Sequence, residues 1–153
     1  MNADHLIKTA KELDLVSKEV VNEYQIKMDT MVASVNTKML GRSDIDTLIG
    51  MNNREMMKDN NANHARFIFS IIYKPNPEVL VNSILWVFST YQSHGFSINY
   101  WPAQLNCWLT VLKEHLTSEG FKQIEPLYNW MQRNIFNFAQ LSNERLPQHN
   151  LEL

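Results

Sequence analysis

His64 is the side chain whose position in this sequence most suggests chemistry, because it interrupts an otherwise apolar helical face. Within the segment from Asn63 to Tyr73, the residues four and seven places after it are Ile68 and Ile71, so the imidazole shares a face with core side chains. Two interpretations stay open. The ring is a hydrogen-bonded core residue, or it contacts a ligand or an internal polar network.

The sequence carries none of the motifs by which common enzymes are recognised. It has no glycine-rich phosphate loop, no nucleophile elbow and no His-Glu-x-x-His. Glu114 and His115 are neighbours on an expected helix, but no second histidine is placed to complete a metal site on that face. We therefore expect neither an enzyme nor a metal site, although an acid–base pair assembled only by the fold leaves no sequence pattern.

His94 is a second histidine of interest, thirty residues after His64 on the next expected helix. A haem globin would use such a pair as its distal and proximal residues. His94, however, falls in the last turn before Gly95, where the helix dipole favours an imidazole that faces solvent. A haem-binding globin is therefore an alternative only, and no haem is expected.

The elements that position these residues are predicted to be helices alone. Apolar residues recur at helical spacing along the chain, strand-like alternation is almost absent, and there are only four glycines. The fold class is therefore all-α, with about six to eight helices. The expected helical stretches are residues 4–40, 43–50, 64–73, 77–94, 102–119 and 121–141.

Several boundaries carry local signals. The strongest is Asn76-Pro77-Glu78, which offers a cap, a proline at the first helical position and an acid in the first turn. The first stretch could break near residues 14–17, where Ser17 would cap a second helix. The run Asn60–Asn63 is expected to mark the start of the His64 helix. Gly120 is expected to end the helix over residues 102–119.

The last expected helix has an apolar seam along one face. Its members step by three and four residues: Ile124, Tyr128, Met131, Ile135 and Phe138. Such a seam fits another helix, either within the chain or across a dimer. The polar residues 142–153, which include Pro147, are expected to be a frayed tail.

The composition is that of a single globular domain spanning residues 1–153. The net charge is −2 and no Lys/Arg cluster accompanies it, so nucleic acid is not an expected partner. Cys107 is the sole cysteine, which excludes an internal disulfide and suits a reducing compartment. No signal peptide and no run of about twenty apolar residues is present, so we expect a cytoplasmic protein without a membrane span.

A series of motifs between His64 and Leu116 occurs in an order shared with a known family. These are His64-x-x-Phe67, then Asn76-Pro77 opening a helix with Trp86-Val87 and Tyr91, then Gly95-Phe96-Ser97, then a helix with Leu105, Leu109 and Leu112. The segment resembles the non-haem globin sensor domains of stressosome regulators and of certain sporulation sensor histidine kinases of bacilli. In length and in lacking an output domain, the chain is most similar to the stand-alone plasmid-encoded sporulation-inhibitory proteins.

This resemblance implies a sensor with a globin-like fold that binds no haem and forms a homodimer through its C-terminal helices. It also implies a fatty acid in an apolar tunnel and a halide ion such as chloride in an adjoining polar chamber. A stand-alone domain of this kind could compete with a sensor histidine kinase for its signal or bind the kinase itself. Either action would lower phosphorelay input and inhibit sporulation.

The resemblance assigns site residues when it is combined with the expected helix faces. The candidates for the tunnel wall are Phe67, Ile71, Leu85 or Phe88, Leu105, Trp108, Leu109, Leu112, Tyr128 and Met131. The candidate donors to a carboxylate head group are His64, Arg66, Tyr73 and Tyr91. A neutral-to-charged switch of His64 would let pH tune the anion site. The remaining alternative is a ligand-free interaction module that binds a partner through the seam of the last helix.

Overall fold

The computed structural model describes residues 2–151, with side chains described as far as Glu144, and this part of the chain contains eight helices and no strand. The all-α prediction is therefore confirmed. The helices are α1 (Ala3–Ala10), α2 (Lys18–Leu40), α3 (Ile45–Ile49), α4 (Arg54–Tyr73), α5 (Pro77–Ser93), α6 (Tyr100–His115), α7 (Ser118–Arg133) and α8 (Ile135–Leu151). None of the described helices is long and apolar enough to span a bilayer.

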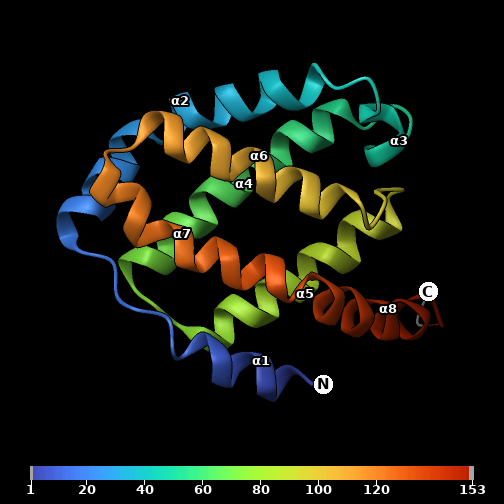
Figure 1. The fold of residues 1–153 in the computed structure, drawn as a ribbon. Coiled ribbons are helices and arrows are strands. Elements are labelled where there is room, and N and C mark those ends of the chain that lie inside the picture. The colour runs from blue at the N-terminus through green and yellow to red at the C-terminus, as the bar shows by residue number, and fades with distance from the viewer. Residues whose placement is uncertain (1, 152–153) are drawn as a thin grey trace.

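The consecutive helices α4 and α5 pack against different sets of helices. α2 packs against α4 and α6, whereas α5 packs against α8 and α1. In Figure 1, α2 and α3 lie along one edge and α1 and α8 along the opposite edge, with the remaining four helices between them. The consecutive helices α4 and α5 are therefore anchored on opposite sides of the molecule.

The first expected helical stretch is broken where Ser17 allows it. α1 ends at Ala10 and α2 begins at Lys18, and the Ser17 side chain accepts a hydrogen bond from the backbone N–H of Val20 at 3.3 Å. The buried residues of α2 recur at the helical spacing of three and four along one face. Its members include Val20, Tyr24, Met31, Val35 and Met39.

The asparagine run is the clearest correction to the expected boundaries. α4 begins at Arg54, and Asn60 and Asn61 lie buried in the middle of the helix rather than at its entrance. Asparagine has a weak helix propensity, but its side chain can bond to neighbouring helices instead of to its own backbone. These tertiary hydrogen bonds outweigh the local preference.

The start of α5 is as expected, whereas the predicted stop at Gly120 is wrong. The Asn76 side chain accepts a hydrogen bond from the Val79 N–H, and Pro77 opens the helix. α6 ends at His115, and Thr117 caps α7 by accepting from the N–H of Gly120, which lies in the first turn of α7. Gly120 is thus part of a helix start.

The last expected helix is two helices. α7 ends at Arg133, Asn134 forms the junction, and α8 continues past Leu141 to Leu151, so the expected end at Leu141 is wrong. Residues 142–151 are helical, and the side chains after Glu144 lie outside the described part, as do residues 152–153.

The expected seam of the last helix is filled within the chain. All five of its members are buried, with Ile135 the most accessible at 7 %. The intramolecular interpretation of the seam is therefore the right one. The ligand-free interaction module loses the surface on which it was based.

Candidate functional site

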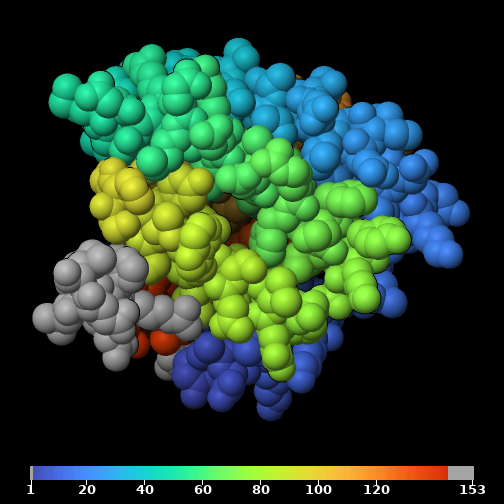
Figure 2. Space-filling model, turned by 180° about the vertical axis from the view of Figure 1, so that it is seen from behind, coloured from blue at the N-terminus to red at the C-terminus, as the bar shows by residue number. Residues whose placement is uncertain are grey.

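A cavity of about 610 Å³ lies between α4 and α5, where these two helices diverge. Its volume falls within the range of small-molecule sites, which is roughly 300–1,000 Å³. Figure 2 shows this face of the molecule hollowed between the segments of α4 and α5, with later parts of the chain visible at the floor. The cavity is the candidate site because it combines this volume with a largely apolar interior, whereas a second pocket beside Ile71 is only about 60 Å³ and a third, beside Glu23, is lined mainly by polar and charged residues.

Most of the cavity wall is apolar and comes from five helices. The apolar lining residues include Phe67 of α4, Ile84, Val87 and Phe88 of α5, Leu105 of α6, Met131 of α7 and Phe138 of α8. Phe88 also stacks on Trp101 with ring centroids 4.5 Å apart, which fixes the orientation of both rings. A long hydrocarbon chain would replace water along this wall.

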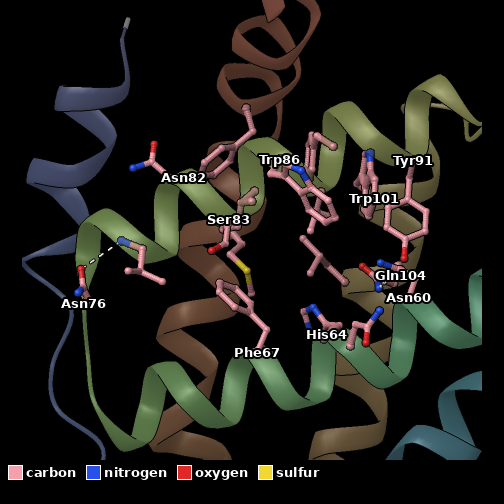
Figure 3. Close-up of a pocket in the computed structure, with 18 of the residues that line it drawn as sticks. Asn60, His64, Phe67, Asn76, Asn82, Ser83, Trp86, Tyr91, Trp101 and Gln104 are labelled. Atoms are coloured by element: carbon pink, nitrogen blue, oxygen red, sulfur yellow. Dashed lines mark hydrogen bonds between the residues drawn. The ribbon is translucent and has the colours of Figure 1, made fainter. Parts of the chain in front are cut away.

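One end of the cavity is polar. Figure 3 shows Asn60, Tyr91, Trp101 and Gln104 gathered at this end, with the His64 imidazole beside them. Asn60 Oδ1 accepts hydrogen bonds from the Tyr100 hydroxyl at 2.8 Å and from Gln104 Nε2 at 2.9 Å. These bonds hold the Asn60 and Gln104 amides in place.

Several polar atoms at this end have no partner among the described residues. They are Asn60 Nδ2, His64 Nδ1, the Tyr91 hydroxyl, Gln104 Oε1 and Trp101 Nε1. Trp101 Nε1 is fully buried, and Asn60, Tyr91 and Gln104 line the cavity. Buried polar groups are normally paired, so this end of the cavity can accept a ligand with polar atoms of its own.

A second layer of hydrogen bonds supports the polar end from behind. Asn61 Oδ1 accepts from Gln104 Nε2 at 3.1 Å and from Trp108 Nε1 at 3.3 Å, and its amide donates to Asn36 Oδ1 at 2.9 Å. This network ties α4 to α2 and α6. It makes the polar end a rigid part of the structure rather than a set of side chains free to rotate.

His64 is linked to the Tyr128 hydroxyl of α7, with its Nε2 2.6 Å from the phenolic oxygen. Because the Tyr128 hydrogen has no other acceptor among the described residues, we assign the hydroxyl as the donor to Nε2, which places the ring proton on Nδ1. Burial lowers the pKa of His64 to about 3, because the charged ring would lose its water. The expected charge switch of His64 near neutral pH is therefore wrong in this protein.

The cavity contains no cationic side chain among its lining residues. Its only charged lining residue is Glu78, which is exposed. Arg66 and Tyr73, which were expected to be head-group donors, are both exposed and do not line the cavity. Arg66 bonds to the Asn63 side chain, and Tyr73 stacks on Phe69.

The structure brings about half of the expected site residues together. His64, Phe67, Phe88, Tyr91, Leu105 and Met131 line the cavity. The others do not. Trp108, Leu112 and Tyr128 are buried in the core behind it, Leu109 is half-buried away from it, and Ile71 lines a separate cavity of about 60 Å³.

Sequence reasoning missed Asn60 and Gln104, the two amides of the polar end. A signal for Gln104 was present, because Tyr100, Gln104 and Trp108 step by four and therefore share one face of α6. A glutamine between two buried aromatic residues indicates an internal hydrogen-bond network. No comparable signal marks Asn60, because an asparagine run also fits a helix start.

His94 lies outside the cavity, as expected. It is the C-cap of α5, it is exposed, and its Nδ1 lies 2.8 Å from the Thr90 carbonyl oxygen. The pair of facing histidines that a haem globin requires is therefore not formed by His64 and His94. Within the described residues no group of three His, Cys, Asp or Glu is placed to hold a metal ion.

No protein family, curated protein or solved structure matches the chain.

Proposed function

We propose that this chain is a sensor domain that binds a molecule with one long hydrocarbon chain, of the fatty-acid class, in the cavity between α4 and α5. The observation that carries the proposal is a cavity of about 610 Å³ whose wall is apolar and whose one end holds accessible polar atoms. Each methylene buried there contributes roughly 0.8 kcal/mol before the costs of binding are subtracted. The polar end would orient the ligand.

A globin-like fold without haem is part of the proposal. It is supported by the placement of α4 and α5 on either side of the cavity, with residues of α6, α7 and α8 completing its wall. The solvent-facing position of His94 fits a domain that uses this space for another ligand. The motifs between His64 and Leu116 that resemble non-haem globin sensor domains point the same way.

The biological role that we propose comes from this resemblance. A stand-alone sensor would compete with a sensor histidine kinase for the fatty acid, or would bind the kinase, and so inhibit sporulation. A homodimer through the C-terminal helices belongs to the same hypothesis. Phe136 of α8, which is 85 % exposed, is a described apolar residue available to such an interface. The resemblance also implies a halide ion, but the described lining residues offer it no cationic partner, so the ion is not part of the proposal.

Native mass spectrometry of the freshly purified protein, followed by addition of hexadecanoic acid, tests ligand binding. We expect an added mass in the range of long-chain fatty acids, or uptake of the added acid. A haem adduct would favour the haem-binding alternative instead. No adduct and no uptake would contradict the proposal.

A pair of matched variants locates the ligand. Ser83→Trp places an indole in the cavity, because Ser83 is a half-buried lining residue of α5. Ser93→Trp makes the same change at an exposed position of the same helix. We expect the first variant to lose the adduct and the second to keep it, and equal occupancy would place the ligand elsewhere.

A further inference from the structure

We propose that the cavity binds its amphiphile with the head group inward and uncharged, as an alcohol, a primary amide or a carboxylic acid in its protonated form. This inference rests on the proposed function and specifies the ligand class of the same cavity. It concerns the polar end formed by Asn60, His64, Tyr91 and Gln104.

The depth of the polar end determines the orientation. Asn60, Gln104 and Tyr91 are 3 %, 2 % and 8 % exposed, whereas Val79 and Trp86 along the cavity are 48 % and 62 % exposed. The opening also has polar lining residues, among them Asn63 and Asn82, but these are exposed and keep their water. The polar groups that lack both water and a protein partner therefore lie inside. A ligand that placed its tail inward would leave the inner amides and the Tyr91 hydroxyl without partners.

The absence of a compensating cation among the lining residues determines the charge. Arg66 is the basic residue of α4 next to the opening, and it is exposed and bonded to Asn63. Glu78 lies in the first turn of α5, at the opposite end of that helix from Tyr91, so no described lining residue places a charge of either sign at the polar end. An ionised head group would lose its water without gaining an opposite charge, which favours its neutral form strongly.

The hydrogen-bonding atoms fit a neutral oxygen group. Asn60 Nδ2, the Tyr91 hydroxyl and His64 Nδ1 supply hydrogens, and Gln104 Oε1 accepts one. A hydroxyl, a carboxylic acid or a primary amide offers both an acceptor oxygen and a hydrogen to donate. A carboxylate only accepts, so it would leave Gln104 Oε1 without a donor.

The titratable groups around this end come from four helices. They are His64 of α4, Tyr91 of α5, Tyr100 of α6 and Tyr128 of α7, whereas Glu78 lies at the far end of α5. Burial keeps His64 neutral and raises the pKa of Tyr100 and Tyr128 well above their usual range. The carboxyl group of a bound acid is then the titrating group that governs affinity.

Three probes of one chain length test the inference by titration calorimetry between pH 5 and pH 8: 1-dodecanol, dodecanamide and dodecanoic acid. We expect the affinities for the alcohol and the amide to be independent of pH. The affinity for the acid should fall about tenfold per pH unit, because only the protonated fraction binds. If the acid binds more tightly than the alcohol at pH 8, and its affinity does not depend on pH, the inference of an uncharged head group is wrong but the proposed function stands. Failure of all three probes at every pH would overturn the proposed function as well.

A neutral acid beside a neutral imidazole and a carboxylate beside a protonated imidazole contain the same number of protons. The pH dependence of binding therefore does not distinguish them, and two variants are needed. In His64→Gln the pH dependence of acid binding should persist, and its disappearance would show a His64 ion pair. In Arg66→Ala acid binding should be unchanged, whereas a loss would place a carboxylate at the opening.

The Tyr91 hydroxyl gives a direct test of the inward head group. Tyr91→Phe should weaken 1-dodecanol binding about five- to tenfold, which is the effect of removing one hydrogen bond. Tyr73→Phe makes the same change on an exposed tyrosine and should leave binding unchanged. Equal affinities for both variants would contradict the orientation.

Discussion

The phenolic oxygen of Tyr128 lies 2.6 Å from Nε2 of His64, so a hydrogen bond joins α7 to the wall of the cavity. The imidazole also lies against Trp108, with ring centroids 5.1 Å apart. His64 therefore belongs both to the core and to the cavity, and the two interpretations of its position are not exclusive. Its protonation state follows from this setting.

Acidification should destabilise the protein through His64. The pKa of His64 is about 3 in the folded chain and near 6.5 in the unfolded chain, so the unfolded chain binds more protons between these values. Stability contributed by neutral His64 is complete above about pH 6.5 and is lost as the pH falls towards 3. At pH 5 the loss is about 2 kcal/mol, measured by urea unfolding at a series of pH values.

The matched control for this effect is His64→Gln, which cannot titrate. Carboxylates contribute to acid unfolding in both proteins, so the difference between their pH profiles isolates His64. We expect the gap in unfolding free energy between the two proteins to narrow by about 2 kcal/mol from pH 7 to pH 5. Parallel profiles would show that His64 is not held neutral by the fold.

Tyr128→Phe should destabilise the protein by about 1–3 kcal/mol, because His64 Nε2 loses its donor inside the core. The control is Tyr73→Phe, which removes a hydroxyl from a side chain that is 70 % exposed and should change stability by less than about 0.5 kcal/mol. Chemical denaturation of both variants gives the comparison. Equal midpoints would mean that the buried hydrogen bond contributes no net stability.

The parts of the fold that could be predicted from the sequence are those with local causes. The capping of α2 by Ser17 and the opening of α5 by Asn76 and Pro77 depend on hydrogen bonds within one turn. The position at which α4 starts depends instead on contacts between helices. Asn60 and Asn61 gain their partners from α2 and α6, which are distant in sequence, so local preference predicts the wrong boundary.

The sequence likewise does not determine which face of each helix meets the cavity. His64 was correctly placed on an inward face, but Arg66 is two residues later, about 200° around the helix, and therefore faces solvent. On α6, Leu105 faces the cavity whereas Trp108 and Leu112 face the core. Apolar spacing identifies buried residues but not the neighbour that each one meets.

Asn61→Ala should destabilise the protein by about 2–4 kcal/mol. The change removes the acceptor of Gln104 Nε2 and of Trp108 Nε1 and the donor to Asn36, and it leaves the buried Trp108 N–H unpaired. Asn63→Ala is the control, because Asn63 is exposed on the same helix and should alter stability by less than about 0.5 kcal/mol. Similar unfolding free energies for the two variants would contradict a structural role for the network.

Gly120→Ala should destabilise the protein although alanine has the higher helix propensity. A Cβ atom at position 120 would lie 2.5 Å from Glu23 Oε1. That carboxylate accepts from the Thr117 N–H at 2.7 Å and the Thr117 hydroxyl at 2.8 Å, and it pairs with Lys27 at 2.7 Å. Because the carboxylate has to leave these partners, we expect a loss of about 1–3 kcal/mol in thermal or urea unfolding.

Gly41→Ala is the matched control, since Gly41 also lies at a helix end. Its φ of −77° suits any residue, and the nearest atom to an added Cβ is the Thr37 carbonyl oxygen at 3.4 Å. Stability should be unchanged or raised by up to about 1 kcal/mol, because alanine restricts the unfolded chain. A Gly120→Ala protein as stable as the Gly41→Ala protein would show that Glu23 can leave Thr117 at no cost, and that this contact does not hold α2 against α7.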